Sequence, residues 1–363
     1  MEHRDAYSSS FGFTSLAGLS SRRRWYFISI ITGIIFLSMT RQQHYIKFSF
    51  QSAPHISRVE ESSYTKSEIP GTVTTGPDYD LIQKLPFQKI GCAAGGEYPI
   101  LMQKNGMINW VCENEGERKV TLIMLYVFNK YASESNTLML DIGANTGYYG
   151  LLAAKFGHKV IQFDLQPECL KILRNSVLAN GFADQVITVA SGVSDTYAII
   201  SVPETGCDGR FPASAHERGQ LNFSTSATLR PLNDFLTMRE NEAIILMKID
   251  TEGNEKRVLV GSKGFFKAQK VLTAIVEVTP GANFWENNSI TKEEVVETLQ
   301  ELVNYGYWII SLWDYSVHRT TESIAKYMES PTFIQTDFVI TVDKDLRALI
   351  GNQDTLDPNQ IKI

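Results

Sequence analysis

Residues 138–150 read LMLDIGANTGYYG, and the remainder of the chain can be interpreted around them. An apolar run ends in Asp141, a loop with Gly143 and Gly147 follows, and Leu151 begins another apolar segment. Glycine has no Cβ atom, so its backbone can turn sharply and approach a ligand closely. A strand, a tight turn and a helix N-terminus in this order are typical of α/β folds that hold nucleotide-like ligands. We therefore predict such a unit here.

The loop pattern narrows the choice of ligand. D-x-G-x-x-x-G differs from the G-x-G-x-x-G of dinucleotide-binding proteins and from the G-x-x-x-x-G-K-[ST] of P-loops. A carboxylate at the mouth of the loop would repel a diphosphate but attract a cation. S-adenosylmethionine carries a sulfonium and an ammonium, and its own carboxylate can meet the amides of a helix N-terminus. The residues predicted to bind this methyl donor are Asp141, Gly143, Asn145, Thr146 and Gly147.

A second acid follows at a suitable spacing. Residues 159–164 form a predicted strand that ends in Asp164, about 20 residues after Asp141, where a carboxylate can hold ribose hydroxyls. Asp195 follows the third predicted strand. It either borders the adenine pocket or belongs to an ordinary turn.

Composition limits the class of protein. A chain of 363 residues holds one large domain and an appendage, and its net charge of −6 argues against a nucleic-acid-binding protein. The four cysteines form no C-x-x-C motif, which disfavours structural zinc. They allow three disulfide pairings in an oxidising compartment. We favour Cys92–Cys112, which flank a predicted hairpin, and expect Cys169 to be packed on the apolar face of a helix.

The N-terminal region does not have the residue pattern of a soluble domain. Arg22, Arg23 and Arg24 precede residues 25–40, which carry no charge. This run is shorter than the ~20 residues that usually cross a bilayer, so it is a signal-peptide core, a short anchor or a buried helix. The lack of a clear cleavage site favours an uncleaved anchor. The position of the arginines then predicts a type II protein that faces the lumen of the Golgi or endoplasmic reticulum.

From about residue 81 the pattern alternates between strands and helices. Residues 100–103 and 107–111 predict a hairpin around Asn105-Gly106, and 117–131 predict a helix. Thr291 and Glu294 form a capping box for a further helix. Residues 203–227 predict a long loop, either a lid or a surface insertion. The predicted core strands are 138–142, 159–164, 185–190, 243–250, 271–278, 307–312 and 333–342.

The chain resembles the FkbM-type family of S-adenosylmethionine-dependent methyltransferases. The matching motifs are residues 141–147, residues 229–236, the segment MKIDTEGNE at 247–255, and Glu277 within Val-Glu-Val. The family's second strand usually ends in Phe-Glu-Pro, whereas this chain has a shorter acid, Asp164, and two inserted residues before Pro167. The resemblance implies a class I methyltransferase (Rossmann-like) α/β fold with a seven-stranded, mostly parallel sheet and helices on both faces. It also implies O-methylation of a sugar or another hydroxyl.

The expected organisation has five parts. They are a disordered cytosolic tail at 1–21, a membrane anchor at 22–41, a flexible stem at 42–80, a hairpin and helix at 81–136, and a methyltransferase domain at 137–363.

Several side chains are candidates for the chemistry. Asp250, Glu252 and Glu277 follow or end predicted strands at the edge where such sheets bind ligands. They can accept a proton, orient sugar hydroxyls or bind a divalent cation, although no motif supports a metal. Alternatively, Asp250 and Glu252 cap the helix that begins near residue 254. His216 and His318 are either bases or ordinary histidines. Three tryptophans either stack on sugars or pack in the core: Trp285, Trp308 and Trp313.

Two classes of function remain open. The first is a membrane-anchored enzyme that methylates a carbohydrate, with a lipid or small metabolite as the second choice of acceptor. The second is a binding protein that keeps the fold without turnover. The acidic residues retained in the motifs favour the enzyme.

Overall fold

The computed structural model describes residues 87–90, 100–103, 114–203, 206–207, 225–238, 242–279, 284–330 and 335–351. All of them lie in the compact unit Phe48–Ile363, and the other unit, Met1–Lys47, lies outside them. The predicted tail, anchor and stem (1–80) therefore fall outside the described residues. Among the helices that the structure does describe, none has the length and apolar character to cross a bilayer.

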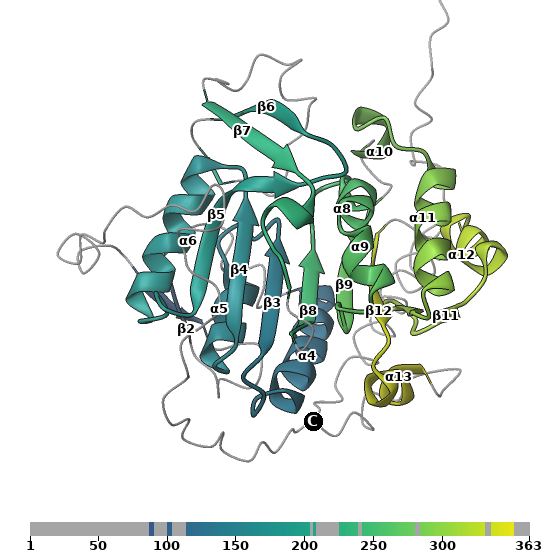
Figure 1. Cartoon of the computed structure of the whole chain (residues 1–363), viewed down its shortest axis with the longest axis horizontal. Helices are drawn as coiled ribbons and strands as arrows, with labels where there is room; N and C mark the ends of the chain where they lie inside the picture. Colours follow the sequence, from purple (N-terminus) through teal and green to yellow (C-terminus); the bar gives the residue numbers. More distant parts are fainter. Residues whose placement is uncertain are drawn as a thin grey trace, which may run out of the picture. The chain divides into compact units, whose positions relative to one another are not determined.

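A ten-stranded sheet forms the centre of the described structure (Figure 1). Its strands are β3 (Thr137–Ile142), β4 (Lys159–Asp164), β5 (Val186–Val193), β6 (Ala198–Val202), β7 (Thr225–Arg230), β8 (Ala243–Ile249), β9 (Thr273–Val278), β10 (Trp308–Ser311), β11 (Val317–His318) and β12 (Thr336–Thr341). Their order across the sheet is β11-β10-β12-β9-β8-β3-β4-β5-β7-β6.

The predicted core strands are all present, but the predicted count of seven is wrong. They lie side by side as β10-β12-β9-β8-β3-β4-β5, and the sheet continues with β11 at one end and β7-β6 at the other. Strand β6 exposes alternate residues, including Ile199. It therefore lacks the continuous apolar run that marks a strand covered on both faces.

The directions of the strands bring several of their carboxyl ends to one edge of the sheet. Strands β4, β3, β8 and β9 pair in parallel, so their carboxyl ends lie together at what we call the carboxyl edge. Strand β12 runs antiparallel to β9, and its first residue, Thr336, pairs with Val278. Residues at the start of β12 therefore meet residues at the end of β9.

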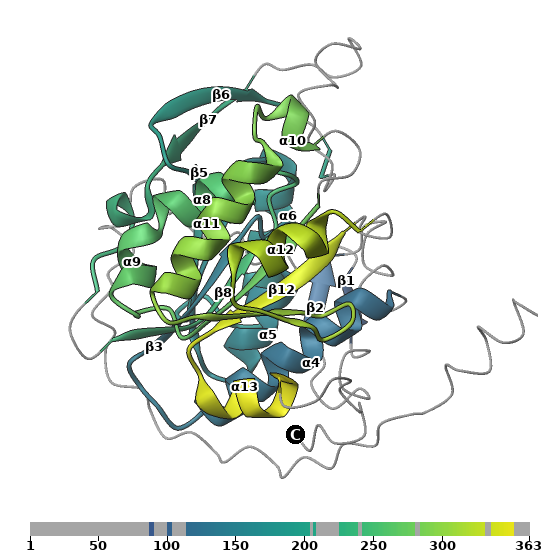
Figure 2. The same cartoon turned by 90° about the vertical axis from the view of Figure 1, so that its right-hand side faces the viewer.

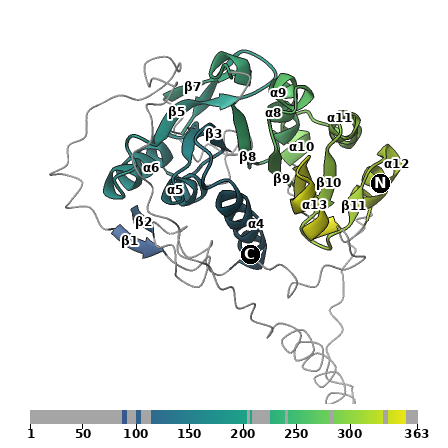
Figure 3. The same ribbon diagram turned by 60° about the horizontal axis from the view of Figure 1, so that its bottom comes forward.

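Helices cover both faces of the sheet, as predicted (Figures 2 and 3). Met139 on β3 points to the layer with α4 and α5, whereas its neighbours Leu138 and Leu140 point to the layer with α8 and α11. The first layer contains α4 (Glu115–Lys130), α5 (Tyr148–Lys155), α6 (Pro167–Ala179) and α13 (Lys344–Gly351). The second contains α8 (Glu255–Gly261), α9 (Lys263–Lys267), α11 (Lys292–Asn304) and α12 (Thr321–Met328), and α10 (Phe284–Asn287) precedes α11.

Two local predictions have clear outcomes. The capping box of α11 is confirmed, because the Glu294 amide donates to Thr291 Oγ1 at 3.2 Å and the Thr291 amide donates to Glu294 Oε2 at 2.9 Å. The predicted strand 100–103 is also present as β2 (Ile100–Gln103), but in the described structure its antiparallel partner is β1 (Phe87–Ile90). The partner predicted for it, 107–111, lies outside the described residues.

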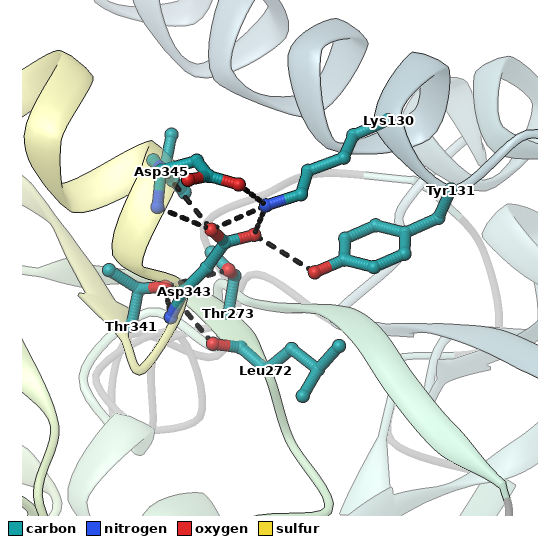
Figure 4. Close-up of polar contacts among 8 residues, drawn as sticks. Lys130, Tyr131, Leu272, Thr273, Thr341, Asp343 and Asp345 are labelled. Carbon is teal, nitrogen blue, oxygen red and sulfur yellow. Dashed lines mark hydrogen bonds and ion pairs between the residues drawn. The ribbon is translucent and has the colours of Figure 1, made fainter.

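An ionic clamp holds α4 to α13 at the end of the sheet opposite the carboxyl edge (Figure 4). Lys130 Nζ donates to the two carboxylate oxygens of Asp343 at 2.6 and 2.7 Å and to Asp345 at 2.8 Å. The Tyr131 hydroxyl also donates to Asp343, at 2.9 Å. Burial alone would raise the pKa of Asp343, but these hydrogen bonds and the Lys130 charge hold that pKa below its usual value. The clamp fixes α4, which carries residues of the site at its other end.

Two variants of the clamp should differ in their free energy of unfolding. Asp343→Asn should lower the free energy of unfolding by about 2–3 kcal/mol, because Lys130 loses its buried carboxylate. Asp345→Asn is the matched control: its side chain is 74% exposed, so it should change stability by less than about 1 kcal/mol. Urea unfolding of both variants at neutral pH measures the difference.

The same contact predicts a pH dependence. Folding lowers the pKa of Asp343, so its contribution is present above the unfolded-state pKa and is lost as the pH falls through the folded-state pKa. The difference between wild type and Asp343→Asn should therefore shrink towards zero at roughly pH 2. A difference that stays constant down to that pH would contradict this account.

Candidate functional site

The glycine turn between β3 and α5 lies against the end of β8. The Gly143 and Ala144 amides donate to the Phe163 carbonyl at 3.0 and 2.9 Å, and the Asp250 amide donates to the Ile142 carbonyl at 3.0 Å. Gly143 has a φ of +83°, and a Cβ atom on it would lie 1.7 Å from the Asp250 carbonyl oxygen. Only glycine permits this approach. The turn and Asp250 are therefore parts of one site.

Asp141 lies beneath this turn rather than at its open mouth. It is 1% exposed, and its Oδ2 atom accepts hydrogen bonds from the Gly150 amide and the Gln162 side chain, both at 3.1 Å. Burial raises the pKa of Asp141 to about 6, against the opposing effects of Gln162 and of Lys248. As arranged here, Asp141 would act on a cationic ligand through its charge and through the backbone that it holds.

Asp164 organises the same loop from the end of β4. Its Oδ2 accepts from the Asn145 amide and its Oδ1 from the Gln166 amide, both at 2.8 Å. Burial raises the pKa of Asp164 to about 6, despite these hydrogen bonds. The ribose contact predicted for Asp164 stays a prediction, and the structure adds a role in fixing Asn145.

Asn145, Thr146 and Gly147 complete the turn. Asn145 has a φ of 51° and Gly147 a φ of 88°, so both lie in the left-handed region, and Thr146 is buried. Gly147 is the N-cap residue of α5. These residues surround the helix N-terminus, as the sequence predicts, and their contact with a ligand stays a prediction.

Gln162 belongs to the site but is absent from the sequence-based candidates. It is fully buried in β4, and its amide nitrogen donates to Asp141 Oδ2 and to the Gly147 carbonyl, at 3.1 and 3.2 Å. Gly150 must be small because a Cβ atom there would lie 2.2 Å from that amide nitrogen. A lone polar residue inside the apolar run VIQF was the signal that could have identified Gln162.

Asp195 and Glu252 are the other two acids predicted at strand ends. Asp195 pairs with Arg257 on α8 at 3.4 Å, and its place near an adenine stays a prediction. Glu252 is half-buried with a φ of 52°. The N-cap residue of α8 is Asn254, without a side-chain capping hydrogen bond, so the capping role considered for Asp250 and Glu252 is wrong. The loop before α8 is held instead by Glu255, whose Oε1 accepts from the Thr251 and Gly253 amides at 2.9 and 3.0 Å.

Carboxylates lie close to a buried ammonium at the carboxyl edge. Lys248, 3% exposed, places Nζ 3.2 Å from Asp250 and 3.6 Å from Asp337. Glu277 on β9 is the register partner of Asp337 on β12. The Lys248 ammonium also lies 5.8 Å from the centre of the Tyr149 ring, and the Tyr149 hydroxyl donates to Glu117. We call this group the Lys248 cluster: Glu117, Tyr149, Lys248, Asp250, Glu277 and Asp337.

Proton positions in the Lys248 cluster follow from burial and charge. Burial and the neighbouring Asp250 carboxylate raise the pKa of Glu277 to about 12, so Glu277 is protonated at neutral pH. Burial opposes the ionisation of Asp250, but Lys248 and a hydrogen bond from Glu277 hold the pKa of Asp250 below its usual value. The pair therefore holds one proton, with the negative charge on Asp250. Asp250 is also the more accessible acid beside Lys248, its side chain 30% exposed against 19% for Asp337.

The residues predicted as possible bases do not all lie in one place. Asp250 and Glu277 come together, whereas His216 lies outside the described residues. His318 is a core histidine: it is 5% exposed, it packs against Tyr327 and Phe338, and burial lowers its pKa. Within the part of the chain described, no group of three or more His, Cys, Asp or Glu side chains is arranged to hold a metal ion.

A disulfide lies beside the glycine turn. Cys169 on α6 is bonded to Cys207, with Cα atoms 4.8 Å apart, so the expectation of an unpaired Cys169 is wrong. Cys207 Sγ is 3.2 Å from Asn145 Oδ1. The predicted partners Cys92 and Cys112 lie outside the described residues. Helical spacing explains the burial of Cys169 but could not show which segment reaches it.

Residues 141–309 match the family model described as the methyltransferase FkbM domain. The chain carries an FkbM methyltransferase domain. The match covers just under half of the chain and contains the glycine turn, Asp250 and Glu277. The match ends before Trp313 and Asp337 and begins after Glu117.

Solved structures give weaker similarities. Trm5b from Pyrococcus abyssi is 14% identical over 66% of this chain and 52% of its own, with a TM-score of 0.30, so the match spans about half of that protein. A putative rRNA-methylase from Clostridium thermocellum is 11% identical over 60% of this chain and 94% of its own, with a TM-score of 0.34. The N-terminal domain of human METTL16 in complex with SAH is 12% identical over 62% and 68%, with a TM-score of 0.32. At these values the similarities carry no argument about function, and no curated protein matches the sequence significantly.

Two glycines with left-handed backbones test the turn. Gly143→Ala should lower the free energy of unfolding by more than about 3 kcal/mol, because strain at positive φ adds to the clash with Asp250. Gly181→Ala is the matched control: its φ is +73° and nothing lies within 4 Å of the added Cβ, so strain alone should cost about 1–2 kcal/mol. Thermal and urea unfolding compare the two. Equal losses would show that the contact with β8 is unimportant.

The disulfide makes a separate prediction. Cys207→Ser should destabilise the oxidised protein by roughly 2–4 kcal/mol, because the bond closes a loop between residues 38 apart. Reductant should therefore destabilise wild type by roughly 2–4 kcal/mol more than it destabilises the variant. Insensitivity of wild type to reductant would contradict the assigned pair.

Proposed function

We propose that this protein transfers a methyl group from S-adenosylmethionine to a hydroxyl oxygen of a sugar or glycan. The observation that carries the proposal is the contact of Gly143 with Asp250, which joins the glycine turn to the acids of the Lys248 cluster. One part of the site suits a cationic methyl donor, and the adjoining part offers a carboxylate to an acceptor hydroxyl.

The residues of the turn fit the donor. Gly143 leaves a space that a Cβ atom would fill, and Asp141 and Asp164 supply negative charge below it. Asn145, Thr146 and Gly147 surround the N-terminus of α5, where the backbone suits a carboxylate. When bound, the donor supplies an electrophilic methyl group on a sulfonium.

Asp250 is the residue we assign to the acceptor. A hydroxyl is a weak nucleophile at neutral pH, and a carboxylate that accepts its proton strengthens it. Asp250 carries the charge of the pair, and Lys248 keeps it ionised. Glu277 holds the shared proton and orients Asp250 through their hydrogen bond. Alignment of the hydroxyl with the methyl group supplies the remainder of the rate enhancement by proximity.

We also propose that the protein is a single-pass type II membrane protein with its catalytic domain in the secretory lumen. The charge pattern around residues 22–41 supports this orientation. The Cys169–Cys207 disulfide supports it independently, since disulfides persist in oxidising compartments. Protease protection of the catalytic domain in sealed microsomes tests the proposal, and digestion without detergent would overturn it.

Calorimetry followed by a transfer assay tests the activity. The wild-type protein should bind S-adenosylmethionine and release a labelled methyl group to members of a glycan panel. Asp250→Asn should keep donor affinity within about twofold and lower kcat by about 10²–10⁴-fold, as expected for loss of a general base. Glu301→Gln on α11, with a side chain 45% exposed, is the control and should keep both values.

Each outcome separates the alternatives. Transfer to lipids or small metabolites only would assign the second choice of acceptor. Donor binding without transfer to any acceptor would indicate a binding protein. Tight binding of NAD or ATP without binding of S-adenosylmethionine would overturn the proposal.

A further inference from the structure

Trp313 differs from the other two candidate tryptophans. Trp285 is 7% exposed, and Trp308 packs against Arg319 and Arg347, whose guanidinium carbons are 4.6 and 4.3 Å from its ring centre. Trp313 is 70% exposed. An exposed indole lacks the stabilisation that burial of its large apolar surface would give, and exposed aromatic rings are frequent at binding sites.

The loop that presents Trp313 is held firmly. Lys119 on α4 donates to the Leu312 and Trp313 carbonyls at 3.1 and 3.3 Å, and the Trp313 amide donates to Ser311 Oγ at 3.1 Å. The Tyr315 amide donates to the Ser311 carbonyl at 2.9 Å and closes the turn. Folding therefore already removes much of the conformational entropy of this backbone, and ligand binding does not have to remove it.

Trp313 lies next to the Lys248 cluster. The Leu312 amide donates to the carbonyl of Asp337 at 2.8 Å, and Ser311 is the register partner of Phe338. Helix α4 reaches both places, because Lys119 holds the tryptophan loop while Glu117 accepts from Tyr149 in the cluster. The exposed indole therefore borders the acids that would face an acceptor.

The groups around Trp313 favour one chemical class of ligand. Pyranose rings have a face of C–H groups that can lie on an aromatic ring, and hydroxyls at their edges that carboxylates accept. Asp314 follows Trp313 in the chain and Asp337 pairs with Leu312, whereas one ammonium, Lys119 Nζ, lies 6.0 Å from the centre of the Trp313 ring. The two carboxylates outnumber that cation and disfavour a phosphorylated or otherwise anionic ligand. A lipid needs a continuous apolar surface, but the other large apolar side chains exposed in the described structure are on β2 or on and next to β6: Leu101, Tyr197 and Ile199.

We infer that the Trp313 indole is the platform for a neutral carbohydrate acceptor, whose pyranose ring stacks there with its hydroxyls towards the Lys248 cluster. This deepens the proposed function and rests on it for the identity of the reaction. Trp313 lies beyond the matched FkbM domain, so the platform is a property of this chain's closing strands.

Binding without turnover gives the first test. The full chain is labelled with 5-fluorotryptophan, and the Trp313 resonance is identified by its loss in Trp313→Phe. Methyl glycosides of glucose, galactose, mannose, fucose and N-acetylglucosamine are titrated individually in the absence of a methyl donor. At least one should shift the Trp313 resonance saturably and leave that of Trp285 unchanged. No shift with any glycoside, or an equal shift of both resonances, would overturn the inference.

Kinetics give the second test, with the glycoside that binds as acceptor. Trp313→Ala should raise the acceptor KM about tenfold and leave the affinity for S-adenosylmethionine unchanged, and Trp313→Phe should recover most of the loss. Ile199→Ala, at a side chain 77% exposed on β6, is the control and should keep the wild-type KM. An unchanged KM in Trp313→Ala would overturn the role in catalysis. A Trp313 shift without any methyl transfer by wild type would contradict the proposed function while leaving the carbohydrate platform in place.

Discussion

The buried ammonium of Lys248 is the constraint from which the arrangement of the site follows. An ammonium can stay charged at 3% exposure only if carboxylates surround it closely. Its partners come from different strands: Asp250 follows β8 itself, and Asp337 is the second residue of β12. Each partner must hold its place, because loss of either would leave a buried charge without compensation. The charge thus fixes the geometry of the carboxyl edge, whatever its contribution to net stability.

The pairing of β3 with β8 connects the two halves of the site. Asp141 is the register partner of Lys248, and beyond them the Asp250 amide donates to the Ile142 carbonyl at 3.0 Å. The glycine turn and the acid pair therefore share one backbone frame. A rigid frame of this kind suits a displacement reaction, in which two reactants must stay aligned within a narrow range of distance and angle. The clamp at Lys130 extends the frame, because α4 carries Glu117 and Lys119 to the same edge.

Much of this could be predicted from sequence, and the exceptions have physical reasons. The core strands are long apolar runs, and the start of α11 is encoded locally by Thr291 and Glu294. Asp141 and Asp250 lie in contiguous motifs, so the sequence could single them out as candidates. Asp337 was not predicted for the site, and Trp313 could not be told from Trp285 and Trp308 as a sugar-stacking candidate, because only the insertion of β12 between β10 and β9 brings Asp337 and Trp313 to the cluster. Cys207 was missed as a partner of Cys169 for a similar reason: the contact is distant in sequence and no periodicity encodes it.

The position of β12 also has a consequence for biosynthesis. Lys248 and Asp250 are translated well before Asp337, and β12 must enter between two strands that precede it in the chain. A nascent chain that has completed β10 has therefore not yet acquired one of the carboxylates beside its buried cation. The edge that would perform chemistry is finished only when the last strand docks, so chains released prematurely by the ribosome would lack a completed catalytic centre.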